Sequence, residues 1–123
     1  MIVPDWSGYH RFRPQIAEAL DPAFYPIDYV DRLLLTGQAQ IFLSEHAAMI
    51  AELKRYPGGA RVAHCLVAAG RMAEITDVIR PRVEAWGRAN GCTKAIVESR
   101  AGWMKVLKPH GYEIFQVSVM KDL

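Results

Sequence analysis

The chain has 123 residues, of which 51% are hydrophobic and 23% are charged. These values are typical of one globular domain, here 1–123, and they exclude a disordered chain. The net charge of +2 gives no argument for nucleic acid as a partner, and no apolar run approaches the length of a membrane span. The first residues, 1–12, lack a basic region followed by an apolar stretch, so we expect no signal peptide and a cytoplasmic protein.

The chain contains only two cysteines, Cys65 and Cys92, and four histidines. In a reducing compartment the cysteines are expected to be free thiols. The spacing of the cysteines and histidines matches no metal-ligand pattern, so we predict no metal site. His64 stands between apolar neighbours and is interpreted as a core histidine with a hydrogen-bond partner.

The first elements in chain order are helical. Residues 1–11 are rich in aromatic and turn residues, and we expect them to form an arm packed on the domain. A helix is predicted over 13–20, with Pro14 in its first turn. Apolar residues at helical spacing predict a second helix over 27–36, which Gly37 ends.

Three strands follow the helices. They are predicted over 39–44, 48–56 and 61–68. The first connection is only a short turn, and the second contains the strong turn signal Pro57-Gly58-Gly59. Short connections of this kind predict an antiparallel meander.

The second half of the chain alternates helices and strands. A long helix is predicted over 73–90, and Pro81 is expected to kink it or to remove one backbone hydrogen bond. A strand over 93–98 follows. The step between this strand and the strand 61–68 is long enough for a right-handed parallel crossover.

The chain closes with a helix and a strand. Ser99 is predicted to cap a helix over 100–108, and a closing strand is predicted over 112–120. The order of elements predicts an α/β fold in which helices cover a mixed sheet.

The stretch from Leu66 to Tyr112, LVAAGRMAEITDVIRPRVEAWGRANGCTKAIVESRAGWMKVLKPHGY, resembles the core of the GNAT family of N-acetyltransferases. It resembles most the short members of phage and prophage type. The order of elements agrees over most of the chain. The resemblance implies a GNAT-like fold, acetyl-CoA as cofactor, and transfer of an acetyl group to a primary amine.

In this family a strand leads into a loop of the form Arg/Gln-x-x-Gly-x-Gly/Ala, whose backbone amides hold the pyrophosphate at the start of a helix. Arg71 falls on the first position of this loop, and the resemblance implies that it contacts phosphate. Glu74 replaces the first glycine and Thr76 the last small residue. Thr76 is interpreted as a phosphate contact or as an N-cap. Either Glu74 points away into solvent, or the loop no longer holds pyrophosphate well.

The resemblance also implies that the pantetheine arm and the thioester oxygen are held by the backbone amides of Leu66, Val67 and Ala68. A general base must lie on the central strands and face the cleft, which makes Glu52 and Glu98 the catalytic candidates. Each is also open to interpretation as an exposed strand carboxylate, which is the commoner role of such a residue. Leu107 occupies the position of the family's tyrosine, which protonates the departing thiolate.

Two functions follow from these residues. The first is an acetyl-CoA-dependent N-acyltransferase whose amine acceptor is not identified. The second is a non-catalytic binding or assembly module on the same scaffold, of phage origin, which Glu74, Thr76 and Leu107 favour. Because sheet edges in short folds invite pairing, a homodimer is one expected partner arrangement.

Overall fold

The computed structural model describes residues 4–100 and 102–123. A four-stranded sheet runs through its centre in the order β1 (Ala39–Leu43), β2 (Ala47–Arg55), β3 (Arg61–Gly70) and β4 (Lys94–Val97). The first three strands are antiparallel neighbours, and β4 is parallel to β3. The predicted α/β class, the meander and the parallel crossover are therefore confirmed.

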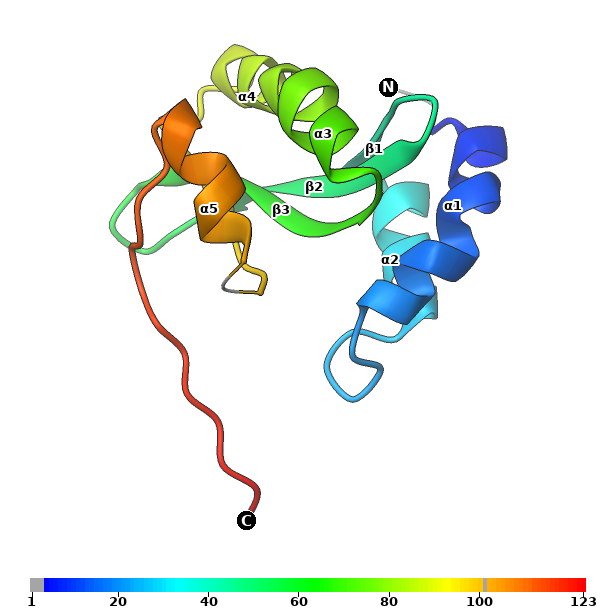
Figure 1. Ribbon diagram of the computed structural model, residues 1–123, viewed down its shortest axis with the longest axis horizontal. Helices are drawn as coiled ribbons and strands as arrows, with labels where there is room; N and C mark the ends of the chain where they lie inside the picture. The colour runs from blue at the N-terminus through cyan, green and yellow to red at the C-terminus, as the bar shows by residue number, and fades with distance from the viewer. Residues whose placement is uncertain (1–3, 101) are drawn as a thin grey trace.

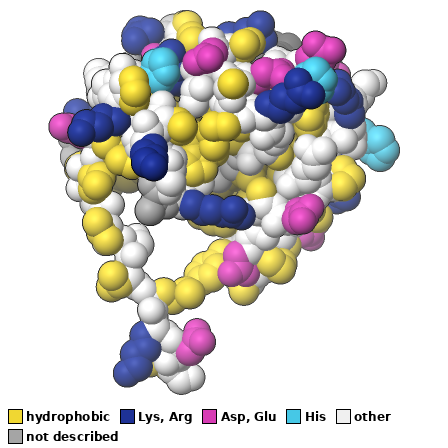
Figure 2. All heavy atoms as spheres, in the orientation of Figure 1, with side chains coloured by type: hydrophobic (Ala, Val, Ile, Leu, Met, Phe, Trp, Pro, Cys, Tyr) yellow, Lys and Arg dark blue, Asp and Glu magenta, His cyan; other side chains and the backbone are white. Residues whose placement is uncertain are grey.

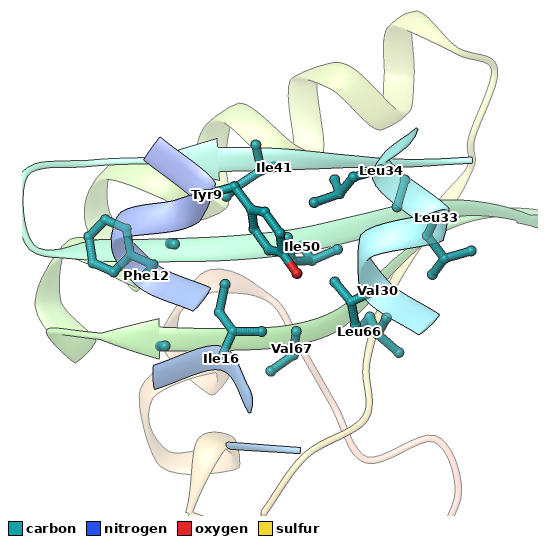
Figure 3. Packing of buried hydrophobic residues seen from close by; sticks show 13 residues of the cluster. Tyr9, Phe12, Ile16, Val30, Leu33, Leu34, Ile41, Ile50, Leu66 and Val67 are labelled. Carbon is teal, nitrogen blue, oxygen red and sulfur yellow. The ribbon is translucent and has the colours of Figure 1, made fainter. Parts of the chain in front are cut away.

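Helices cover both faces of the sheet (Figure 1). On one face, α1 (Trp6–Ala19) and α2 (Ile27–Leu35) bury apolar side chains against β1, β2 and β3. Figure 3 shows this cluster, in which side chains from both helices meet those of the strands. On the other face, α4 (Arg80–Ala89) and α5 (Trp103–Leu107) pack over a second cluster.

The crossover from β3 to β4 is helical along most of its length. It consists of α3 (Met72–Glu74), a π-helical turn over Ile75–Ile79, and α4. Pro81 is the second residue of α4 and carries no backbone N–H. The π-helical turn, which is wider than an α-helical turn, ends two residues before the proline. The predicted disturbance of the helix at Pro81 is therefore a π-helical turn. Among the described residues, no helix is long and apolar enough to cross a membrane.

The prediction of an N-terminal arm over 1–11 is wrong for the described part of that range. α1 begins at Trp6, and the carboxylate of Asp5 accepts a hydrogen bond from the backbone N–H of Gly8 (2.9 Å). Pro14 consequently lies inside the helix and not in its first turn. The missed signal is an apolar face at helical spacing, formed by Tyr9, Phe12 and Ile16, which are all buried.

Two predictions for the C-terminal part are also wrong. α5 begins at Trp103 after Gly102, and no side chain caps it, so Ser99 is not its N-cap. The expected closing strand over 112–120 does not form within the described chain. This segment is extended and exposed, and Figure 1 shows it running away from the sheet. Its alternating sequence suits a strand, but such a segment becomes one only against a partner.

Gly70 ends β3 in a conformation that a side chain would not tolerate. Its φ is +106°, and an added Cβ would lie 2.6 Å from the Cα of Ala47. Gly70→Ala is therefore expected to lower the free energy of unfolding by roughly 2–4 kcal/mol, from backbone strain and overpacking together. Urea unfolding measures this change.

Gly58→Ala is the matched control for Gly70→Ala, because nothing lies within 4 Å of its added Cβ. The control is expected to change stability by less than about 0.5 kcal/mol. Equal effects of the two substitutions would contradict the structural account of Gly70.

Candidate functional site

β3 and β4 run side by side over only part of their length. Their pairs extend from Val62 with Lys94 to Cys65 with Val97, whereas β3 continues to Gly70 and stays paired with β2. Past Cys65, the side of β3 that faced β4 has no described strand along it, so the backbone polar groups there are not paired with a strand on that side. We call this unpaired edge of β3, beyond its last pair with β4, the β3–β4 fork. The three residues predicted to hold the pantetheine arm, Leu66, Val67 and Ala68, all lie along it.

A β-bulge bends β3 where the fork begins. Ala51 pairs with Cys65 and Ile50 pairs with Val67, which leaves Leu66 without an opposite residue on β2. Leu66 and Val67 both pack into the cluster under α1 and α2 (Figure 3). Because a bulge bends its strand and increases the local twist, β3 diverges from β4 at this point.

Glu74 is turned toward the connection between β1 and β2. Its carboxylate accepts hydrogen bonds from the Ser44 hydroxyl (2.7 Å) and the His46 backbone N–H (2.8 Å), and it lies 3.0 Å from Nδ1 of His46. The Ser44 hydroxyl and then the His46 amide hold the pKa of Glu74 below its ordinary value. The carboxylate therefore points away from the loop, but toward the β1–β2 turn and not into solvent as the first alternative expected.

Arg71 and Thr76 differ in how well they suit a phosphate. Arg71 is exposed and directly precedes α3, and its backbone N–H donates to the carbonyl of His46 (2.9 Å). Thr76 is buried inside the π-helical turn, and its hydroxyl donates to the carbonyl of Met72 (3.1 Å). The N-cap interpretation of Thr76 is therefore wrong, and its hydroxyl hydrogen is already engaged.

A small cavity of about 10 Å³ lies between the fork and the helices α4 and α5. Its lining includes Cys65, Val97, Trp103, Leu107 and Tyr112. Space of this size holds about one water molecule. Leu107 is buried there, so the position of the family's tyrosine is apolar in this chain.

Tyr112 is the phenol that the sequence interpretation missed. Its hydroxyl donates to Oε2 of Glu84 (2.8 Å) at the edge of the small cavity. Burial, followed by the bond to Glu84, raises the pKa of Tyr112, so the phenol keeps its proton at neutral pH. The sequence shows that Tyr112 directly follows Gly111 beyond the last predicted helix, but it does not show that Tyr112 contacts α4.

Both predicted catalytic carboxylates meet a buried histidine on the α1–α2 side of the sheet. Nδ1 of His64 lies 3.0 Å from Oε1 of Glu52, and its Nε2 lies 3.1 Å from Oε1 of Glu98. Glu52 is directly opposite His64 on β2, and Ile96 is opposite it on β4. Glu98 is two residues after Ile96, so it shares the same face. The interpretation of His64 as a core histidine with a partner is confirmed.

The Glu52–His64–Glu98 chain has one buried end and one exposed end. The side chain of Glu52 is 12% exposed and that of Glu98 is 65% exposed. The hydrogen bond from His64 is the main cause that holds the pKa of Glu52 below its ordinary value. Of the three side chains Glu52, His64 and Glu98, Glu98 is therefore the one that solvent and a ligand can reach.

Nε2 of His64 faces Glu98 on the other side of the ring. It is buried, and none of the described groups meets it in good hydrogen-bond geometry, although Oε1 of Glu98 is 3.1 Å away. The ring therefore has one nitrogen bonded to Glu52 and one nitrogen that Glu98 approaches.

A wide hollow on the described surface lies elsewhere. It has a volume of about 630 Å³ and is lined by residues of α1 and α2, among them Tyr9, Arg13 and Asp31. Arg13 and the Tyr9 hydroxyl both bond to Asp31 (2.6 Å each). This wide, open hollow contains none of the residues that the sequence singled out, so the fork and its histidine chain form the candidate site.

Glu52→Gln is expected to lower the free energy of unfolding near neutral pH by roughly 1.5–3 kcal/mol, because His64 loses a hydrogen bond to a charged group. The folded-state pKa of Glu52 lies below its ordinary value of 4.5. The stabilisation is therefore complete above that value and is lost as the pH falls through the folded-state pKa. Urea unfolding between about pH 7 and pH 3 should show the difference from wild type shrinking on the acid side. A constant difference would argue against this ion pair.

No protein-family model and no curated protein sequence matches the chain. Solved structures do match it in fold. An acetyltransferase of Trypanosoma brucei is 14% identical with a TM-score of 0.68, and the match covers 99% of this chain and 97% of that one. An aminoglycoside N-acetyltransferase in complex with CoA is 13% identical with a TM-score of 0.71, covering 96% and 90% of the two chains.

Glucosamine-6-phosphate N-acetyltransferase from Arabidopsis thaliana is 12% identical to this chain with a TM-score of 0.66. The match covers 99% of this chain and 94% of that one. At these identities the similarity concerns the fold and not the individual site residues. The chain therefore has the GNAT fold of these acetyltransferases.

Proposed function

We propose that the chain is an N-acyltransferase that transfers the acetyl group of acetyl-CoA to a primary amine. The observation that carries the proposal is the β3–β4 fork, which opens backbone polar groups beside Glu98, the exposed end of the histidine chain. The fold supports it, because structural neighbours include N-acetyltransferases solved with CoA or with a bisubstrate analogue.

The residues along β3 suit such a cofactor. An extended arm can lie along the open edge of Leu66–Ala68 and accept or donate hydrogen bonds there. At the far end of β3, Arg71 and the first amides of the helix that begins at Met72 offer positive charge to phosphate. Glu74 no longer stands against this arrangement, because its carboxylate is bonded to Ser44 and His46.

Glu98 is the proposed general base. Bound acetyl-CoA would supply the acetyl group as a thioester. The nitrogen of the acceptor would bond to the carbonyl carbon as the C–S bond breaks, and CoA would leave as a thiolate that takes a proton from solvent. Glu98 would accept the proton that the nitrogen gives up. His64 lies 3.1 Å behind Glu98 and orients its carboxylate, while Glu52 holds the ring in its orientation. His64 and Glu52 are positioning residues, since solvent does not reach the ring.

A non-catalytic binding module is the second candidate. Buried Leu107 and the small volume of the cavity beside it, about 10 Å³, favour this function. The module would use the same fork without the proton transfer. Binding of acetyl-CoA together with the absence of any transfer would favour it over the enzyme.

Arg71→Ala is expected to weaken acetyl-CoA binding by roughly 10- to 100-fold, the loss expected for a charge-assisted hydrogen bond. Isothermal titration calorimetry of the full chain measures the affinity. Arg55→Ala is the matched control, because Arg55 pairs with Arg61 at the opposite end of β3. No binding to the wild-type chain, or equal losses for both variants, would refute the proposed cofactor site.

Glu98→Gln is expected to slow acetyl transfer by roughly 10²- to 10⁴-fold, the usual contribution of a general base. The rate of thiol release from acetyl-CoA, measured with a panel of primary amines, gives this value. Glu18→Gln removes an exposed carboxylate of α1 and serves as the control. Unchanged transfer by Glu98→Gln would exclude Glu98 as the base.

A further inference from the structure

Two lysines lie on the same face of the sheet as the histidine chain. Lys54 of β2 is opposite Val62 of β3, and Val62 is in turn opposite Lys94 of β4. Residues that are two apart along a strand point to the same face. Lys54 and Lys94 therefore share the face of His64, on either side of Val62. We call Lys54 and Lys94 the lysine pair.

The spacing of the strands gives the distance from the lysine pair to the proposed base. Residues on one face are about 6–7 Å apart along a strand, so the lysine pair lies one such step from His64. Glu98 follows β4 in the opposite direction, and its carboxylate lies 3.1 Å from Nε2 of His64. One to two steps of the strand, or about 7–13 Å, therefore separate the lysine pair from the carboxylate of Glu98.

Solvent reaches both ammonium groups. Nζ of Lys54 lies 3.5 Å from Oε1 of Glu52, and the Lys54 side chain is 37% exposed. Burial opposes its positive charge, but Glu52 and more distant groups, Glu98 among them, raise the pKa of Lys54 above its ordinary value. Lys94 is exposed and takes part in none of the ion pairs between described residues. The lysine pair can therefore accept an anion on the same face as Glu98.

The surrounding surface suits a small anion better than an acidic polymer. Figure 2 shows Lys and Arg side chains interspersed with Asp and Glu side chains over the visible face of the molecule, and the net charge is only +2. A nucleic acid needs a continuous basic stripe or patch. Two lysines that flank one valine match a single carboxylate or phosphate group.

We infer that the acceptor is a small amine that carries an anionic group, a carboxylate or a phosphate, at the end opposite its nitrogen. Lys54 and Lys94 bind the anionic group while the nitrogen meets Glu98. A chain of about six carbons has the required order of length. A second cationic group at the same end would be repelled by the lysine pair. This acceptor class rests on the proposed acetyl transfer and adds to it what the acceptor must contain.

Four acceptors of similar chain length test the class: 6-aminohexanoate, 6-aminohexyl phosphate, hexylamine and 1,6-diaminohexane. The wild-type kcat/KM is expected to be at least about 10-fold higher for an anionic amine than for hexylamine, the gain expected of a charge-assisted hydrogen bond. It is expected to be lowest for the diamine. The release of thiol from acetyl-CoA gives each rate, and the ratio between 6-aminohexanoate and 6-aminohexyl phosphate identifies the preferred anion.

Lys94→Gln removes one charge of the lysine pair and leaves the histidine chain in place. It is expected to raise KM for the anionic amines by roughly 10-fold and to leave kcat unchanged, because the lost contact holds the substrate and not the reacting atoms. Both constants for hexylamine are expected to stay as in wild type. Lys94→Glu is expected to shift the preference toward 1,6-diaminohexane.

Lys121→Gln is the matched control, because it makes the same change of charge in the exposed C-terminal segment, which Figure 1 shows running away from the sheet. Equal effects of Lys94→Gln and Lys121→Gln, or an equal loss with hexylamine, overturn the role of Lys94. Similar kcat/KM values of the wild type for all four amines overturn the acceptor class and leave acetyl transfer standing. Transfer to none of the four amines overturns the proposed function and the acceptor class together.

Discussion

Parallel pairing between β3 and β4 stops after four residue pairs, and most of the functional geometry depends on this limit. The bulge at Leu66 bends β3 away at the point where β4 ends. The unpaired edge that results lies between the two apolar clusters, because β3 contributes side chains to both. A ligand in the fork can therefore meet groups from either face of the sheet. The carboxylate of Glu98 is one such group, since it follows the last paired residue of β4.

The histidine chain shows how register turns a buried polar group into part of a site. His64 would carry a large desolvation cost in an apolar core without partners. The hydrogen bond to Glu52 offsets part of that cost, and Glu98 lies close to the other ring nitrogen. Both carboxylates lie there because β2, β3 and β4 align at this level. The same arrangement places His64 between the buried carboxylate of Glu52 and the exposed carboxylate of Glu98. Glu98 therefore differs from an ordinary surface glutamate, because a buried imidazole lies beside it.

The sequence was sufficient to predict the meander and the crossover. Turn residues mark the ends of their strands and helices, and the spacing of apolar residues changes from every second residue to helical spacing between them. It also identified Glu52 and Glu98 as candidates. It could not show that His64 lies between them, because contacts across three strands depend on a register that no single strand encodes. The direction of Glu74 was equally hidden, since its partners lie about thirty residues earlier. The closing strand was predicted from alternation alone, and alternation does not specify a partner.

The bonds from Glu74 to Ser44 and His46 tie together two segments that the chain order separates. Contacting residues in one network do not contribute independently to stability, so the effects of substitutions at Ser44 and Glu74 are not additive. A chain with glycine at position 74 would lose the shorter of the two hydrogen bonds that the Ser44 hydroxyl makes. Evolutionary change in the loop that follows β3 is therefore constrained by the turn between β1 and β2, and the two segments are expected to vary together among relatives.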